Sequence, residues 1–270
     1  RSNKQIPDMI DEFFRTRERI VRIAQHENGE KFSGELINDF RERTRATVKI
    51  EDGCNRFCSY CVIPYARGRV RSKPLEDIRE EISSLEKKGF SEIVLVGINL
   101  SAYGTDCGAS ICDAVELAAS FDGIKRVRLG SLEPDHMTPE VTKRLAECKK
   151  LCPQFHISLQ SGCDKTLKRM NRHYTAAEYE ELCTRLRSEF EDTTLTTDVM
   201  VGFSGETKED FEISRDFVRK IGFEKVHVFP YSRRAGTRAA EFPDVVENAE
   251  KERRSREMIA AAGEVRHEFL

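Results

Sequence analysis

The sequence predicts an α/β fold in which six strand-plus-helix units form an open, partial barrel with parallel strands. Short apolar runs alternate with longer amphipathic segments from residue 44 to about residue 231, a pattern typical of parallel strands joined by helices. The chain has 270 residues, of which 39% are hydrophobic, so it can bury a core of the size that such a domain needs. A closed barrel of this kind has eight units, and six fit an open barrel better.

Each strand is predicted from a short run of β-branched or apolar residues. The first run, residues 47–50 (TVKI), leads directly into a cysteine-rich loop. The second, residues 93–96 (IVLV), is apolar throughout, as expected for a parallel strand that is covered on both faces. The predicted strands are residues 47–50, 93–96, 125–129, 155–159, 195–201 and 225–229.

The helices are predicted from apolar spacing and from residues that start or stop helices. Ile78, Ile82 and Leu85 share one face of the first barrel helix, and a glycine follows its end. Pro139 directly follows a threonine, which suits the first turn of a helix. Gly222 ends another helix. The predicted helices are residues 74–88, 111–121, 139–148, 176–189, 208–221 and 247–270.

Two segments flank the predicted barrel domain, which we place at residues 44–240. Residues 1–43 form an N-terminal linker with helix-like apolar spacing as far as Val21 and a turn at Asn28–Gly29. Residues 241–270 hold a charged C-terminal helix that stops without a cap. The sequence also lacks an initial Met, and we therefore expect it to be an excised fragment of a longer chain.

Charge and cysteine content narrow the function classes. The net charge is −2, so overall charge does not predict binding to nucleic acid or to membranes. The longest apolar stretch, residues 93–100, is far shorter than the roughly 20 residues of a membrane span. The odd number of cysteines, nine, indicates a reducing, cytoplasmic compartment rather than a disulfide framework. We expect a monomer without a membrane partner.

Cys54, Cys58 and Cys61 stand in a C-x3-C-x2-C run. Three thiolates can bind three irons of a 4Fe–4S cluster and leave the fourth iron open to a small chelating ligand. Zinc sites use a different spacing and usually a distant second pair of cysteines, which this sequence does not show. The spacing therefore favours a cluster, with ordinary thiols as the plainer alternative.

Polar residues and glycines follow the predicted strands. Because the carboxyl ends of parallel strands meet at one edge of a barrel, we expect these residues to gather around the cysteine loop. A glycine there lets a ligand approach the backbone closely. The residues concerned are Gly97, Asn99, Glu133, Gln160 and Asp198, with the GFSGET segment (202–207) and Tyr231.

The segments CNRFCSYCVIPYARG, VLVGIN, SLEP, HISLQSG, LKRMNRHYT, TDVMVGFSGET and FPYSRRAGTRAA together resemble the methylthiotransferase family of radical S-adenosylmethionine (SAM) enzymes. Within it, HISLQSG and VFPYSRRAGT resemble the branch that modifies N6-threonylcarbamoyladenosine beside the tRNA anticodon. The resemblance covers residues 44–240 and implies the radical SAM partial (β/α)6 TIM-like barrel. Ser204, Ala235 and Arg238 stand where the family usually has proline, which changes loop geometry but removes no ligand.

The resemblance implies a role for each site residue. Cys54, Cys58 and Cys61 would bind the cluster, whose open iron binds the amino and carboxylate groups of SAM. Segment 97–99 and Glu133 would surround the SAM amino group, and the planar guanidinium of Arg172 would pair with the SAM carboxylate. Two further residues would bind the ribose hydroxyls. The implied SAM-binding set is Tyr60, Gly97, Asn99, Glu133, Gln160, Arg172 and Asp198, of which Gln160 and Asp198 face the ribose.

The implied reaction begins with reductive cleavage of SAM to methionine and a 5′-deoxyadenosyl radical, which takes a hydrogen from C2 of the adenine. Sulfur would then come from an auxiliary 4Fe–4S cluster in an upstream domain, and a second SAM would supply the methyl group. A second three-cysteine spacing does not occur in residues 1–270. The implied partners are tRNA, bound mainly through a downstream domain, and an electron donor such as flavodoxin or ferredoxin.

Local basic clusters are the remaining candidates for contact with tRNA phosphates. One cluster consists of Arg67, Arg69 and Arg71, a second begins with Arg233 and Arg234, and a third spans residues 251–256. Each could equally be an ordinary solvated surface.

Three alternative functions stay open. Sister enzymes of the family methylthiolate an aspartate of a ribosomal protein, and others act on a different tRNA adenosine. A protein of another class would be a non-catalytic scaffold whose three cysteines bind zinc or iron structurally. Such a scaffold has no use for Asn99, Glu133 and Arg172 together, so the strand-end residues favour an enzyme.

Overall fold

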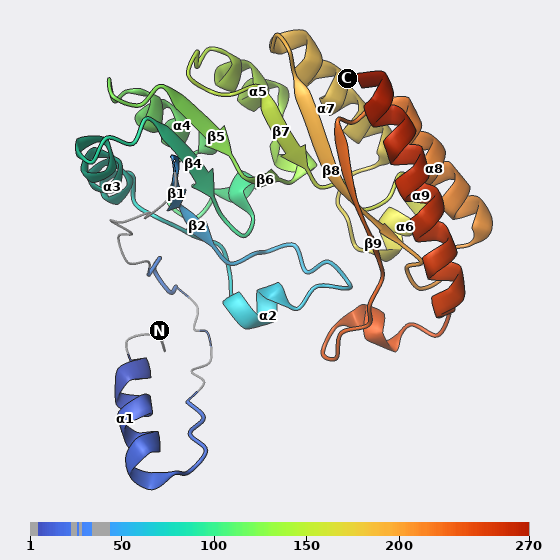
Figure 1. Ribbon diagram of the computed structural model, residues 1–270, viewed down its shortest axis with the longest axis horizontal. Coiled ribbons are helices and arrows are strands. Elements are labelled where there is room, and N and C mark those ends of the chain that lie inside the picture. The colour runs from blue at the N-terminus through green and yellow to red at the C-terminus, as the bar shows by residue number, and fades with distance from the viewer. Residues whose placement is uncertain (1–4, 23–25, 27–28, 34–43, 270) are drawn as a thin grey trace.

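The computed structural model describes residues 5–22, 26, 29–33 and 44–269. Seven parallel strands lie in two adjoining sheets (Figure 1), whose strand orders are β1-β4-β5 and β6-β7-β8-β9. Only Gly130 separates β5 from β6, so the two sheets continue one another and six strand positions follow the order of the chain. The strands are β1 (Ala46–Lys49), β4 (Glu92–Val96), β5 (Arg126–Leu129), β6 (Ser131–Leu132), β7 (Gln154–Ile157), β8 (Thr194–Val201) and β9 (Lys225–Pro230).

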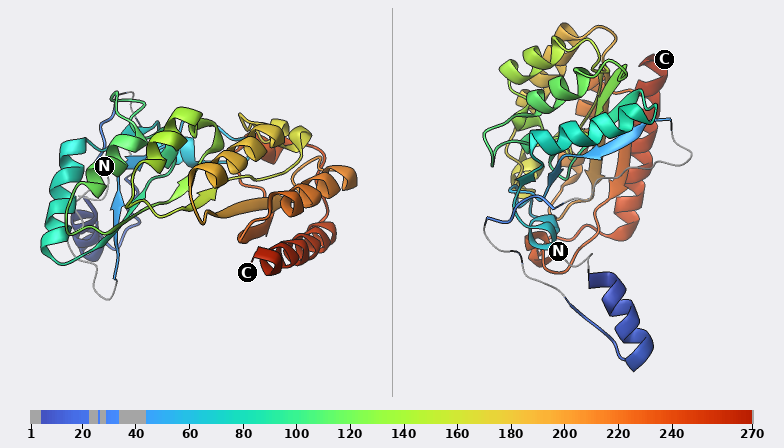
Figure 2. Two further views of the ribbon diagram at one scale, coloured as in Figure 1. Left: turned by 90° about the horizontal axis from the view of Figure 1, so that it is seen from above. Right: turned by 90° about the vertical axis from the view of Figure 1, so that its left-hand side faces the viewer.

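Helices follow the strands and cover one side of them (Figures 1 and 2). Along this side α3 packs against α4, α4 against α5, α5 against α7, α7 against α8, and α8 against α9, which also packs against β9. This arrangement confirms the predicted α/β fold with parallel strands. The helices are α3 (Leu75–Lys87), α4 (Ile111–Ala119), α5 (Pro139–Ala146), α7 (Ala176–Glu189), α8 (Lys208–Ile221) and α9 (Asn248–Phe269).

The core lies between the strands and these helices. Val48, Ile93, Leu95 and Phe155 point to this side and are fully buried. Their sequence neighbours on the strands point to the opposite, concave side because side chains alternate along a strand. Those neighbours are largely polar, as in the QFHI sequence of β7, so the concave side is the place for a polar ligand.

Several short elements at the carboxyl edge of the strands were not predicted. β2 (Glu51–Asp52) pairs antiparallel with β3 (Arg71–Ser72) and so closes the base of the loop that carries the cysteines. The helices α2 (Ile63–Arg67) and α6 (Asp164–Arg169) both follow that loop in the sequence, α2 directly and α6 after β7. All of these are too short to show a period in the sequence.

The N-terminal helix α1 (Ile6–Thr16) lies apart from the barrel in two views (Figures 1 and 2). It ends earlier than the apolar spacing suggested, because Arg17 adopts a left-handed conformation (φ 59°) and its N–H caps the carbonyl of Phe13. Of the predicted turn, Gly29 has a φ of 80°, whereas Asn28 lies outside the described residues. No helix in the described part of the chain combines the length and apolarity needed to cross a membrane.

Candidate metal and cofactor site

The cysteine loop begins at a glycine that the surrounding backbone requires. Gly53 has a φ of 88°, and a Cβ at this position would lie 2.0 Å from the carbonyl oxygen of Arg69. The N–H of Cys54 donates to the carbonyl of Gly68 (3.0 Å), and the N–H of Cys61 donates to that of Cys58 (2.9 Å). The loop is thus folded on itself and closed against the β2–β3 pair.

The far side of the loop docks on the segment that follows α6. The N–H and hydroxyl of Ser59 donate to the carbonyls of Met170 (2.9 Å) and Arg169 (2.8 Å). Asn171, in a left-handed conformation (φ 57°), donates from Nδ2 to the carbonyl of Phe57 (3.0 Å). These bonds join parts of the chain more than 100 residues apart, and they bring Arg172 to the cysteines.

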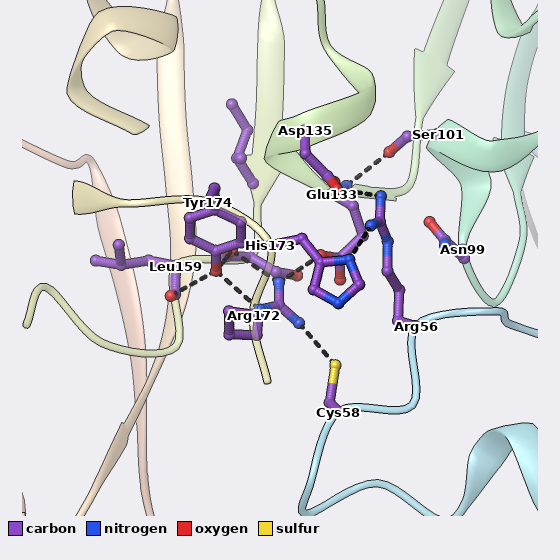
Figure 3. A network of polar contacts seen from close by, with 12 residues as sticks. Arg56, Cys58, Asn99, Ser101, Glu133, Asp135, Leu159, Arg172, His173 and Tyr174 are labelled. Atoms are coloured by element: carbon purple, nitrogen blue, oxygen red, sulfur yellow. Dashed lines mark hydrogen bonds and ion pairs between the residues drawn. The ribbon is translucent and has the colours of Figure 1, made fainter. Parts of the chain in front are cut away.

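Arg172 is the centre of the polar network in Figure 3. Its buried guanidinium, 3% exposed, forms an ion pair with Glu133 and donates to Cys58 Sγ (3.3 Å), Tyr60 OH (3.4 Å) and Tyr174 OH (3.0 Å). Burial raises the pKa of Glu133 even though Arg172 lowers it. Arg172 thus joins Cys58 and Tyr60 of the cysteine loop to Glu133 and to its own near neighbour Tyr174, which brings together three separate parts of the sequence.

A second arginine supports the cysteine loop from the side. Arg56 forms an ion pair with Asp135, and its Nη1 lies 2.9 Å from Nδ1 of His173 (Figure 3). Asp135 lies two residues after Glu133, and His173 directly follows Arg172. Both partners of Arg56 therefore stand next to residues of the Arg172 network. Arg56, Asp135 and His173 were not among the predicted site residues, because a motif does not show which side chains pair across the fold.

The strand end at Gly97 and Asn99 is organised by a buried carboxylate that was also not predicted. Glu51 is fully buried, and its Oε2 accepts a hydrogen bond from the N–H of Asn99 (2.7 Å). A Cβ on Gly97 would lie 2.6 Å from the same oxygen, so only glycine fits. Nδ2 of Asn99 lies 3.8 Å from Cys54 Sγ. Burial raises the pKa of Glu51 to about 7.

Gln160 and Asp198 lie together on the other half of the sheet. The N–H of Gln160 donates to the carbonyl of Asp198 (2.8 Å), and Gln160 is 8% exposed with a φ of 64°. The carboxylate of Asp198 lies 3.2 Å from Nε2 of His156, whose Nδ1 lies 3.0 Å from Thr196 Oγ1. The structure shows no direct contact between these side chains and the cysteines within the described residues. His156 is a further polar residue that the sequence did not single out.

The profile of the Radical SAM superfamily matches residues 48–218. The chain belongs to this superfamily. The match includes the cysteine loop and every strand end described above except that of β9. The predicted superfamily is therefore confirmed.

Curated relatives are similar along nearly the whole chain. A tRNA-2-methylthio-N(6)-dimethylallyladenosine synthase of Pelotomaculum thermopropionicum is 40% identical over 255 residues, which are 92% of this chain and 56% of the relative. A threonylcarbamoyladenosine tRNA methylthiotransferase (MtaB) of Thermotoga maritima is 40% identical over 234 residues, 86% of this chain and 54% of the relative. The chain thus spans about half the length of these relatives, and their equal identity does not separate the two branches.

Solved radical SAM structures share the fold at low sequence identity. The methyltransferase TsrM from Kitasatospora setae has a TM-score of 0.61 with 17% identity and covers 72% of this chain and 38% of its own. Coproporphyrinogen III oxidase (HemN) from Escherichia coli has a TM-score of 0.60 with 15% identity, over 84% of this chain and 54% of its own. These matches confirm the partial barrel.

The cysteines of this radical SAM chain fit a cluster. No three His, Cys, Asp or Glu side chains among the described residues are placed to bind a single metal ion. A 4Fe–4S cluster needs a different arrangement, because each of its thiolates binds a different iron, and polar side chains stand beside two of the cysteines, Arg172 at Cys58 (3.3 Å) and Asn99 at Cys54 (3.8 Å). Burial raises the pKa of Cys54 to about 11 and also raises that of Cys61, and a metal is what deprotonates such thiols. The nearby Arg172 adds a positive charge that favours thiolates.

The first two of the three predicted basic clusters differ in their surroundings. Arg71 is buried and lies 3.7 Å from Asp52 and 3.8 Å from Glu30, and Arg67 lies 3.8 Å from Asp52. Arg69 lies over the ring of Phe57 (4.6 Å). In contrast, the exposed Arg233 and Arg234 form no ion pair with any described residue; a backbone carbonyl, that of Phe242, accepts from Arg233 (2.7 Å). The first cluster is partly neutralised within the protein, and the second keeps its charge.

Proposed function

We propose that this chain is the SAM-cleaving core of a radical SAM methylthiotransferase. The observation that carries the proposal is the meeting of Cys58, Glu133 and Arg172 at the carboxyl edge of the strands. Cys54, Cys58 and Cys61 would bind a 4Fe–4S cluster. When bound, that cluster supplies the electron for reductive cleavage of SAM to methionine and a 5′-deoxyadenosyl radical.

The residues around the cysteines would hold SAM by its charged ends. Glu133 carries an acceptor for the SAM amino group, and Arg172 carries donors for the SAM carboxylate. In the ligand-free arrangement these two groups pair with each other. Bound SAM would replace this one ion pair with two, one between Glu133 and its amino group and one between Arg172 and its carboxylate. Gly97 leaves the backbone accessible and Asn99 offers polar atoms beside it, whereas Gln160 and Asp198 would offer theirs from the other half of the sheet. Tyr60 is placed against Arg172.

For the substrate, we propose C2 of N6-threonylcarbamoyladenosine next to the tRNA anticodon. The similarity to the Thermotoga enzyme and the polar concave side of the sheet support this choice. His156 and Asp198 form a pair there, the ring of His227 lies 5.9 Å from that of His156, and Arg128 lies beside Glu92 (2.8 Å). A substituent with a carboxylate and a hydroxyl can use such groups, whereas an apolar one cannot.

A second candidate is methylthiolation of N6-dimethylallyladenosine. The Pelotomaculum relative, with the same identity over a longer alignment, favours it. The polar side chains on the concave side are the feature that speaks for the threonylcarbamoyl substrate instead. For either substrate, sulfur insertion would need a second cluster, and residues 1–270 contain no second three-cysteine spacing.

The test is anaerobic reconstitution of the chain with iron, sulfide, SAM and a reductant, followed by mass spectrometry. We expect a broad absorbance near ~400 nm and 5′-deoxyadenosine as a product. With either modified anticodon-arm RNA, we expect the chain alone to yield no methylthio product. The natural protein in which this chain occurs, supplied with both RNAs, should methylthiolate the threonylcarbamoyl form faster, and a preference for the dimethylallyl form would select the second candidate. Absence of both cluster and 5′-deoxyadenosine would refute the core proposal.

A further inference from the structure

Lys251, in the first turn of α9, is a buried cation without a carboxylate partner. It is 7% exposed and forms no ion pair with any described residue. Other buried cations are paired: Lys73 with Glu81, and Arg254 with Glu206 (2.7 Å). An unpaired buried charge is costly, because burial removes its hydration and no carboxylate in the described part of the chain compensates for that loss.

The side chain of Lys251 lies beside a glycine and beside a tyrosine whose hydroxyl has no partner among the described residues. Gly202 (φ 68°) makes room for it, since a Cβ there would lie 2.4 Å from Cγ of Lys251. The ammonium group lies 5.6 Å from the centre of the Tyr231 ring. The hydroxyl of Tyr231 is buried and has no hydrogen-bond partner among the described residues. Burial lowers the pKa of Lys251, and the nearby positive charge of Arg233 lowers it further.

The loop after β9 adds exposed positive charge on the same side. Arg233, Arg234 and Arg238 are exposed and form no ion pair with any described residue. The loop is fixed to the cysteine loop, because the N–H of Ala239 donates to the carbonyl of Ser59 (2.7 Å). The positive charge is therefore at the carboxyl edge of the strands, beside the candidate cluster site.

We propose that Lys251, Tyr231 and Arg233 form a subsite for one phosphate group of the RNA substrate. The oxygens of a phosphate can accept hydrogen bonds from the ammonium of Lys251, the phenol of Tyr231 and the guanidinium of Arg233 at the same time. Its negative charge would also give Lys251 an oppositely charged partner. The subsite depends on the proposed function, because it presupposes that RNA is the substrate. The aromatic contacts Tyr60–Phe203 (6.3 Å) and Phe203–Tyr231 (4.9 Å) separate it from the cysteine loop. It would thus orient the RNA backbone while the nucleoside reaches the cluster.

The experiment measures binding of a fluorescein-labelled anticodon-arm RNA between about 50 and 200 mM KCl. Lys251→Met retains the length of the side chain, and Arg233→Gln tests an exposed residue whose replacement leaves the core intact. We expect each variant to bind about tenfold more weakly at low salt, with a slope of log K against log salt that is smaller by about 0.7 to 0.9. Lys87→Met, on α3 at the opposite end of the barrel (Figure 1), is the matched control and should bind as the parent does.

Each outcome decides between the proposals. If the parent binds RNA but neither variant changes the slope, the subsite is wrong and the proposed function stands. If the parent does not bind RNA at all in this salt range, the subsite is wrong, and the assays for 5′-deoxyadenosine and methylthio product decide the proposed function separately. If Lys251→Met and Arg233→Gln weaken SAM binding in calorimetry instead of RNA binding, the anion at this site is the SAM carboxylate. If Lys251→Met fails to fold, Arg233→Gln alone gives the answer.

Discussion

The helix-covered side of the strands and their carboxyl edge bury side chains of opposite kinds. On the covered side, Ile93, Leu95 and Phe155 are fully buried. Three of the helices there, α4, α7 and α8, begin with capping boxes, as in Thr175–Glu178, where side chains satisfy free N–H groups. Of the buried side-chain polar atoms without a partner among the described residues, only Oε2 of Glu189 and Oγ of Ser255 lie on these helices, as expected for a part of the molecule that provides stability.

The carboxyl edge instead buries more polar atoms that have no partner among the described residues. These include Oε1 of Glu51, Oδ1 of Asn99 and the hydroxyls of Ser204 and Tyr231. Such atoms lower stability in the ligand-free protein, and a bound ligand can satisfy them. Substitutions on the two sides are therefore expected to differ in their main effect. Those on the covered side should mainly change the free energy of unfolding, and those at the edge should mainly change the binding of ligands.

The largest effect expected at the edge is that of Cys58→Ala. The variant should lose the absorbance near ~400 nm after reconstitution and should form no detectable 5′-deoxyadenosine, because one iron of the cluster loses its ligand. The free energy of unfolding should change by less than about 1 kcal/mol, since the residue lies in a loop. Cys107→Ala, at an exposed cysteine, is the control and should behave as the parent. A Cys58 variant with parental activity would contradict the cluster assignment.

The largest effect expected on the covered side is that of Phe155→Ala. Phe155 is fully buried and its ring lies 4.9 Å from that of Phe190, so the cavity should lower the free energy of unfolding by about 3–5 kcal/mol. Urea titration measures this change. The folded variant should still bind SAM with the parental affinity, and a selective loss of SAM binding would break the distinction between the two sides.

At the edge, Glu51→Gln should raise stability in a pH-dependent way. The pKa of Glu51 is about 7 in the folded chain against an ordinary 4.5, so the folded state holds this proton more tightly than the unfolded state. Its contribution is fully present below pH 4.5 and is lost as the pH rises through 7. Glutamine cannot ionise and therefore avoids that loss. The free energy of unfolding of the variant should exceed that of the parent by about 3 kcal/mol at most at pH 8. Urea titrations at pH 4.5 and pH 8 test this, with the exposed Glu80→Gln as control; equal gains at both pH values would contradict the assignment.

A smaller effect is expected for SAM recognition. Arg172→Ala removes charge-assisted hydrogen bonds worth about 1.5–3 kcal/mol, which corresponds to roughly 10- to 150-fold weaker SAM binding. Asp198→Ala should weaken binding by a similar order, and iron content should be unchanged in both. The exposed Lys168→Ala controls for loss of a nearby positive charge. Calorimetry that finds parental affinity for either variant would remove that residue from the SAM site.

The sequence predicted the long elements well because their ends carry local signals. The bounds of α7 and α8 agree with the prediction, and both helices begin with a threonine capping box; a left-handed glycine, Gly222, ends α8. The break between β5 and β6 at Gly130 and the short β2–β3 pair were missed. These features depend on which strand lies beside which, and a local pattern does not contain that information.

The site was predictable only to the extent that its residues stand in motifs. The spacing of the cysteines and the strand-end positions of Glu133 and Asp198 were visible in the sequence. The roles of Glu51 and Lys251 were not, because each is defined by a missing partner in space. Arg71 illustrates the same limit, since a residue in a basic run proved to be buried against Asp52 and Glu30.

The strands pair in the order in which they occur in the chain, from β1 to β9. When each strand is synthesised, the strand with which it pairs is therefore already present. In a closed barrel, by contrast, the first strand can complete its pairing only after the last strand has been made. Such a sheet can assemble progressively while the ribosome is still synthesising the chain. α9 is the last of these elements, and it packs against β9 and α8. Once α9 has packed there, it protects β9, the edge strand that is synthesised last, from pairing with another chain.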